Sequence, residues 1–255
     1  MGVLNVTPDS FSDGGRFLET RLAIEHGLAM VDEGAAIIDV GGESTRPGAN
    51  PISEDEELRR ILPVIERLQQ TGAIISVDTS RPKVIRAAAQ AGATMINDVR
   101  ALTQDGALEA AAATECGLCL MHMQGEPRTM QQAPHYVDVV NEVKAFLQAR
   151  VQSCLAAGVD AGRLVIDPGF GFGKTMEHNL ELLRRLRELT GERPVLVGLS
   201  RKSTVGQLTG RPPDQRVHGS VALALLAVLN GASIVRVHDV AATVDALRIL
   251  AAVRG

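Results

Sequence analysis

Residues 163–175 read RLVIDPGFGFGKT, a short apolar run followed by an aspartate and a loop with three glycines. An apolar run bounded by turn residues predicts a buried β-strand. The closing Gly-Lys-Thr fits the end of a phosphate-binding P-loop, but Pro168 stands where that motif needs its leading glycine. The stretch is therefore either an altered nucleotide loop or a different ligand-binding turn that uses Asp167.

The same order of apolar run and polar loop recurs along the whole chain. Amphipathic or Ala/Leu-rich segments separate the runs and predict helices at 21–33, 54–70, 82–91, 106–115, 137–157, 177–190, 215–230 and 241–252. Helix signals support them: Ser53 with Glu56 forms a capping box, and Pro82 suits a first helical turn. The candidate strands are 3–6, 36–42, 74–79, 94–99, 118–123, 164–169, 195–200 and 234–239.

Eight strands alternating with eight helices in 255 residues predict an α/β fold, specifically a TIM (β/α)₈ barrel. A doubly wound open sheet is the alternative, because strand count alone does not show closure. No change of composition marks a linker, so we expect a single domain over 1–255. The first apolar run starts almost at Met1 and predicts a short first strand, as in a chain that is truncated or begins at an alternative start.

Composition excludes several classes of protein. The formal net charge is -4, basic residues are scattered and Trp is absent, so we expect no nucleic-acid partner. No apolar run approaches the roughly 20 residues of a membrane helix, and we expect no membrane partner. Three cysteines, an odd number, favour a reducing, cytoplasmic location without a disulfide framework.

Polar residues gather where the predicted strands end. In both parallel architectures ligands bind at the carboxyl ends of the strands, so these side chains predict an enzyme site rather than an inert scaffold. Carboxylates and an amide suit a flat heterocycle with an amino-pyrimidine edge, whereas cations with a glycine-rich loop suit an anion. The first group is Asp78, Asn97 and Asp167, and the second is Thr45, Arg46, Lys202, Arg236 and His238.

Eight segments in this order resemble the signature segments of the dihydropteroate synthase family, over essentially the whole chain. They are LNVTPDSFSDGG, DVGGESTRPG, SVDTSRP, INDV, MHMQGEPRTMQ, DPGFGFGKT, GLSRKS and RVHDV. The resemblance implies a TIM barrel that condenses 7,8-dihydropterin-6-ylmethyl diphosphate with 4-aminobenzoate. The products are 7,8-dihydropteroate and diphosphate, a step of folate biosynthesis.

The resemblance also implies a role for each matching residue. Lys202 is expected to bind the pterin with Asp78, Asn97 and Asp167, whereas Arg236 and His238 hold the diphosphate, and Thr45 and Arg46 close over the reacting centre. The expected catalytic residues are Arg46, Lys202, Arg236 and His238. Ser203 is expected beside the aminobenzoate carboxylate, and Asn5 is expected to help bind Mg²⁺, the implied cofactor. The expected substrate-binding residues are Thr45, Asp78, Asn97, Met121, Asp167, Phe172, Lys202, Ser203, Arg236 and His238.

The chemistry agrees with these residue types. A methylene on an electron-rich ring carries a good leaving group, so we expect a dissociative displacement in which stabilising the diphosphate matters more than a strong base. The family is typically homodimeric, and 221–229 and 241–252 are candidate interface helices. Sulfonamides, which mimic aminobenzoate, are expected inhibitors because residues 7–15 carry no insertion of the kind found in resistant members.

Two other functions remain open on the sequence. One is the pterin-binding domain of a corrinoid methyltransferase, which would not need GGESTRPG, SRKS and RVHD together. The other is a non-catalytic paralogue that binds a pterin or phosphate, which we would expect to have lost part of the anion set. The three anion-handling segments and the loops after the first two predicted strands are all present here.

Several side chains have two interpretations. Asp167 is either a pterin ligand or a helix cap, Lys174 either a solvated loop residue or functional, and His122 either a barrel-interior residue or functional. Asp39 and Asp98 either support the site or cap loops. Cys116 and Cys119 form a C-x-x-C without a second pair, which favours buried structural thiols over zinc, and Cys154 is predicted to lie in the core.

Overall fold

Eight parallel strands surrounded by helices form one domain in the computed structural model, which describes residues 1–7, 15–43, 51–126, 129–191 and 193–255. The first strand is short, as the position of its apolar run predicted. The strands are β1 (Gly2–Asn5), β2 (Ile37–Gly41), β3 (Ile74–Asp78), β4 (Met95–Asp98), β5 (Gly117–Met121), β6 (Leu164–Asp167), β7 (Leu196–Val197) and β8 (Ile234–Val235).

The sheet closes on itself. Strands β1 to β6 pair in chain order, and β7 pairs with β8. Parallel bridges join Ile166 to Val195 and Gly2 to Val237, and the backbone N–H of Val3 donates to the carbonyl of Val237 over 3.0 Å. The predicted (β/α)₈ barrel is therefore confirmed, and the alternative of an open doubly wound sheet is wrong.

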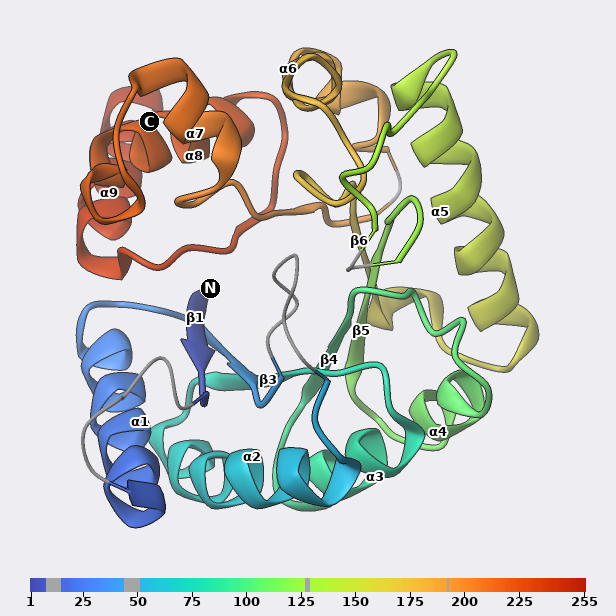
Figure 1. Ribbon diagram of the computed structural model, residues 1–255, viewed down its shortest axis with the longest axis vertical. Helices are drawn as coiled ribbons and strands as arrows, with labels where there is room; N and C mark the ends of the chain where they lie inside the picture. The colour runs from blue at the N-terminus through green and yellow to red at the C-terminus, as the bar shows by residue number, and fades with distance from the viewer. Residues whose placement is uncertain (8–14, 44–50, 127–128, 192) are drawn as a thin grey trace.

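The helices follow one another round the strands, so that α9 comes to lie beside α1 (Figure 1). The backbone N–H of Ala241 at the start of α9 donates to Glu33, just after α1, which closes the outer ring. The helices are α1 (Gly15–Asp32), α2 (Glu54–Leu68), α3 (Pro82–Gln90), α4 (Ala107–Ala112), α5 (Val139–Ala156), α6 (Met176–Arg184), α7 (Ser203–Thr209), α8 (Val217–Leu229) and α9 (Val240–Arg254).

The helix ends agree with the sequence signals. Ser53 accepts a bond from the backbone of Glu56 at the start of α2, and Pro82 occupies the first turn of α3. A short helix, α7, stands between β7 and α8 in addition to the eight predicted helices. It packs between α6 and α8 in the outer ring (Figure 1).

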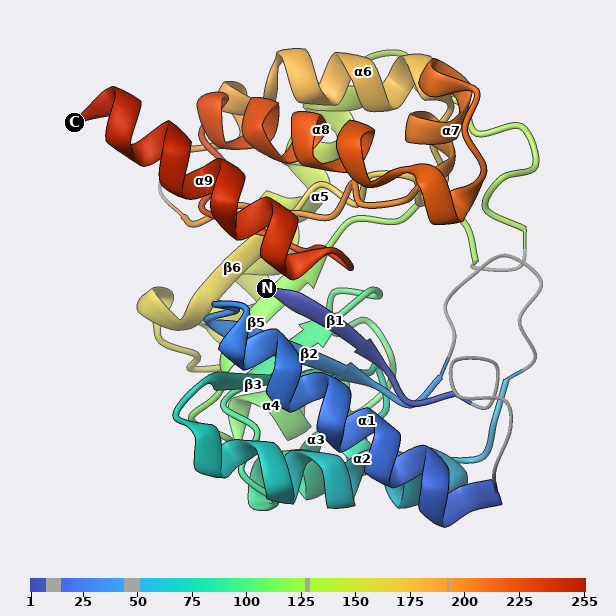
Figure 2. The ribbon, with the colours of Figure 1, turned by 90° about the vertical axis from the view of Figure 1, so that its left-hand side faces the viewer.

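Along the strands, the inward-facing residues are apolar near the amino ends and polar near the carboxyl ends. Ile37, Met95 and Cys119 form a small buried cluster with Leu196 inside the barrel. Two residues further along, β2 and β4 present Asp39 and Asn97 on the same inward face. Since β1 and β2 point the same way (Figure 2), this polar layer lies towards the carboxyl-end mouth.

No helix in the described part of the chain is long and apolar enough to cross a membrane.

Candidate active site

Arg236 links two strands' carboxylates across the barrel mouth. Its Nε donates to Asp39 Oδ2 over 2.6 Å, and its Nη2 donates to Asp78 Oδ2 over 2.9 Å. Asn97 donates its side-chain N–H to the same Asp39 oxygen over 3.0 Å. Residues from β2, β3, β4 and the end of β8 therefore share one hydrogen-bonded network.

Asp39 lies at the centre of this network. It therefore supports the site and does not cap a loop. It is fully buried, and it bonds a guanidinium and an amide instead of capping a loop. Asp98 caps the loop that follows it, because its carboxylate accepts the backbone N–H groups of Arg100 and Leu102 over 2.8 Å each. Burial raises the pKa of Asp78 to about 7, against the opposing charge of Arg236.

Asp167 and Lys202 bring two further, opposite charges to the barrel mouth. Asp167 is buried, and its carboxylate accepts the backbone N–H of Gly169 over 2.7 Å. Burial raises the pKa of Asp167, while the charge of Lys202 lowers it. Burial in turn lowers the pKa of Lys202 to about 8, with Asp167 opposing that shift.

The glycine-rich loop after β6 brings Phe172 beneath Lys202. The ammonium of Lys202 lies 4.6 Å from the centre of the Phe172 ring, and it also donates to the carbonyl of Phe170. Met121, the last residue of β5, is buried. A Cβ on Gly169 would approach the Met121 side chain to 3.3 Å, so the two residues adjoin.

The loops after β7 and β8 are tied together. His238 Nδ1 lies 3.1 Å from Ser200 Oγ, which also accepts the backbone N–H of His238. Arg201, in the left-handed region with φ of 58°, pairs with Asp239 and directs the chain into α7. Arg201 directly follows the predicted strand 195–200, but its left-handed backbone could not be predicted, because only glycine marks a positive φ in a sequence. Ser203 begins α7 and is exposed.

Asn5 lies at the end of β1, level with Gly41 and Asp78 on the next two strands. A Cβ on Gly41 would stand 3.8 Å from Asn5 Oδ1 and 3.5 Å from Asp78 Cβ, so glycine leaves the space between them open. Within the described residues no group of three or more His, Cys, Asp or Glu side chains could hold a metal. Thr45 and Arg46 lie outside the described residues.

The ambiguous loop residues are buried. Lys174 is only 3% exposed, so its interpretation as a solvated residue is wrong. It lies 2.9 Å from His122 Nδ1, and His122 is itself a buried interior residue. Cys116, Cys119 and Cys154 are free and buried, as predicted, and burial raises the pKa of each thiol.

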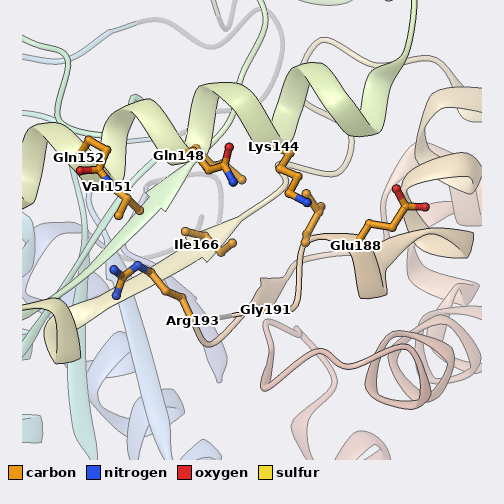
Figure 3. Close-up of a pocket in the computed structure, with 10 residues that line it drawn as sticks. Lys144, Gln148, Val151, Gln152, Ile166, Glu188, Gly191 and Arg193 are labelled. Atoms are coloured by element: carbon orange, nitrogen blue, oxygen red, sulfur yellow. The ribbon is translucent and has the colours of Figure 1, made fainter.

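A separate hollow of about 550 Å³ lies on the outer wall (Figure 3). Side chains of α5 line one side, and Arg193 lines the other. Ile166 forms part of it, and since neighbours on a strand point to opposite faces, Asp167 points away into the barrel. The hollow contains none of the predicted site residues.

Fold and site together define a barrel enzyme whose mouth offers carboxylates and an amide on one side and cations on the other. A family model described as "Pterin binding enzyme" matches residues 1–238. The dihydropteroate synthase of Escherichia coli (strain K12) is 53% identical over 254 residues, 99% of this chain and 90% of that protein.

Solved structures agree. The Yersinia pestis dihydropteroate synthase in complex with a sulfonamide drug is 54% identical, with a TM-score of 0.95 over 100% of this chain and 93% of that one. The Xanthomonas albilineans enzyme in complex with 7,8-dihydropteroate is 53% identical, with a TM-score of 0.92 over the same shares of the two chains. The chain therefore belongs to the pterin-binding enzymes and, among them, to the dihydropteroate synthases, which are transferases.

Proposed function

We propose that the residues at the barrel mouth carry out the dihydropteroate synthase reaction, joining 7,8-dihydropterin-6-ylmethyl diphosphate to 4-aminobenzoate. The observation that carries this assignment is the shared network in which Arg236 bridges Asp39 and Asp78 beside Asn97. A ring with amino and amide edges finds both acceptors and donors there, next to a cation for its diphosphate.

Asp78, Asn97 and Asp167 hold and orient the pterin, with Met121 and Phe172 against its faces. The carbon–oxygen bond to diphosphate breaks first, the amine of aminobenzoate then bonds to the pterin methylene, and the nitrogen gives up one proton to solvent. Arg236, Lys202 and His238, with Thr45 and Arg46 from the loop after β2, stabilise the departing charge. Ser203 faces the aminobenzoate carboxylate.

Asn5 is the residue that would share a bound Mg²⁺ with the substrate's diphosphate. Its side-chain oxygen lies beside the space over Gly41, and Mg²⁺ characteristically takes few protein ligands and keeps several waters. When bound, Mg²⁺ would neutralise part of the diphosphate charge. The chain's own contribution is one amide oxygen held at the end of β1.

The decisive experiment supplies dihydropterin diphosphate and Mg²⁺, with and without 4-aminobenzoate, and measures diphosphate release and dihydropteroate. We expect release that depends on the amine and matches the dihydropteroate formed. No release at any amine concentration would favour the non-catalytic paralogue. Methyl transfer from methyl-tetrahydrofolate without dihydropteroate formation would favour the corrinoid methyltransferase domain.

Sulfonamides should inhibit in competition with 4-aminobenzoate. The physical reason is that both molecules present an arylamine and an acidic group of similar spacing to the same subsite. Varying 4-aminobenzoate at several sulfonamide concentrations should raise its KM without changing kcat. An unchanged rate in saturating sulfonamide would contradict this prediction.

Dimerisation and a cytoplasmic location stay predictions. Large apolar side chains are exposed on α8 and α9, the two helices named as candidate interfaces, as a subunit contact would require. They are Leu226, Leu229, Ile249 and Val253. The three free, buried cysteines are compatible with a reducing compartment.

A further inference from the structure

Lys174 is a buried amine to which the proposed reaction assigns no task, and burial lowers its pKa to about 7. It is 3% exposed and follows the glycine-rich loop after β6. Burying an ammonium is costly unless its hydrogens are all bonded. The hydrogen-bond partners of Lys174 therefore indicate its function.

The three hydrogens of Lys174 have three acceptors. Nζ donates to the carbonyls of Gly169 and Phe172, each over 3.0 Å, and lies 2.9 Å from His122 Nδ1. Burial, and then the charge of Lys174, lower the pKa of His122 to about 3. The imidazole is therefore neutral, and with its hydrogen on Nε2 it offers the Nδ1 lone pair to the ammonium.

Every carbonyl of the loop from Gly169 to Gly173 accepts a side-chain hydrogen bond. Lys174 serves two of them, Lys202 bonds Phe170, Gln131 bonds Gly171, and Tyr136 donates to Gly173 over 2.9 Å. Three of the five loop residues are glycines with positive φ, which by themselves leave the backbone many conformations. The buried bonds from Lys174 and Tyr136 select one of them.

This one conformation bears directly on the pterin-binding side chains. Gly169 donates its N–H to the carboxylate of Asp167 over 2.7 Å, and its carbonyl is held by Lys174. His122 donates its backbone N–H to the carbonyl of Asp167 over 2.9 Å. Lys174 thus connects both the loop and the neighbouring strand to the position of Asp167.

We propose that Lys174 is a positioning residue for the pterin substrate, which fixes the 169–173 loop from beneath so that Asp167 and Phe172 meet the ring. It touches no reacting atom and acts through these two side chains. The assignment rests on the proposed function. It also gives Lys174 a different role from Lys202, whose ammonium lies over the ring of Phe172 at the barrel mouth.

Replacing Lys174 with Met keeps the length of the side chain and removes its three hydrogen bonds. We expect the KM for dihydropterin diphosphate to rise about tenfold or more, because the Phe172 carbonyl loses its donor and the Gly169 carbonyl keeps only the backbone N–H of Phe172. The KM for 4-aminobenzoate should change less than about threefold, since that subsite lies on α7. Gln131→Ala is the matched control. The bond from Gln131 to Gly171 is exposed, and water can replace it, so the pterin KM should rise less than about threefold.

His122 supplies a second test if the Lys174→Met protein does not fold. His122→Leu removes one acceptor and leaves the two carbonyl bonds, and it should raise the pterin KM about fivefold. His122→Asn restores an acceptor and should return the KM to within about twofold of the wild type. An unchanged pterin KM in folded Lys174→Met, or in His122→Leu where Lys174→Met does not fold, would overturn the proposal.

A spectroscopic readout distinguishes failure of this inference from failure of the proposed function. Tyr136, bonded to Gly173, is the protein's one tyrosine, and there is no tryptophan. Its near-UV circular dichroism should change in Lys174→Met and stay close to wild type in the Gln131→Ala control. A wild type without synthase activity would refute the proposed function, whereas a wild-type tyrosine signal in Lys174→Met would refute the positioning role.

Discussion

Arg236→Ala should lower turnover about a thousandfold, as expected when a donor to developing negative charge is lost from a preorganised site. Arg236 is fixed at the barrel mouth by its bonds to Asp39 and Asp78. Its guanidinium is therefore already in position when the diphosphate departs. Steady-state diphosphate release, with both substrates saturating, measures the effect. Arg236→Lys keeps the charge but cannot bond both carboxylates at once, and its turnover should fall between the two.

The same substitution also affects stability, and the two effects have to be separated. Removing one partner of a buried ion pair costs about 3–5 kcal/mol, no more than the low end of the 5–15 kcal/mol that hold an ordinary domain folded. Urea unfolding gives the folded fraction, to which turnover is then normalised. A turnover loss no larger than the loss of folded protein would show that Arg236 only stabilises the barrel. Arg185→Ala, which breaks partly exposed ion pairs away from the mouth, is the control for charge removal elsewhere and should change both stability and turnover little.

The stability of Arg236→Ala should also fall as pH rises. Asp78 already has a pKa of about 7 in the folded protein, above its ordinary value, because burial outweighs the charge of Arg236. A group whose folded pKa is raised binds more protons when folded, so its contribution is largest at acidic pH and is lost as pH rises towards 7. Without Arg236 the pKa of Asp78 rises further. The difference in stability between variant and wild type should therefore stay constant in acid and widen as pH rises through about 7.

The barrel and the location of its polar rim could be predicted because both depend on local sequence. Apolar runs set the strands, and the change from Val77 to Asp78 or from Ile166 to Asp167 marks the strand ends. In a parallel barrel all such ends face one side, so the side chains converge without knowledge of any contact. That convergence predicted the Arg236–Asp78 neighbourhood, although its bonds span 158 residues.

Lys174 shows why the rest could not be predicted. Its burial depends on His122, 52 residues away, and on the carbonyls of a loop whose conformation comes from positive φ angles. A lysine beside glycines and a threonine has the same local sequence whether it is solvated or buried. Asp39 was ambiguous for a similar reason, because its partner Arg236 lies 197 residues further along the chain.

Gly169→Ala should destabilise the protein by more than about 3 kcal/mol. The residue has a φ of 69°, and a Cβ would stand 1.8 Å from the carbonyl oxygen of His122, an overlap that only backbone movement relieves. Gly158→Ala is the matched control, since it has a φ of 84° but nothing within 4 Å of the added Cβ. It should cost only the left-handed backbone penalty of about 1–2 kcal/mol.

Urea midpoints of the two variants separate backbone strain from the steric overlap, because only Gly169 carries both. The overlap also displaces β5 from the loop, so the pterin KM of any folded Gly169→Ala protein should rise while that of Gly158→Ala does not change. Equal midpoints would mean that the backbone around His122 yields at little cost. The close contact between the β5 end and the loop would then not be what holds Asp167 in place.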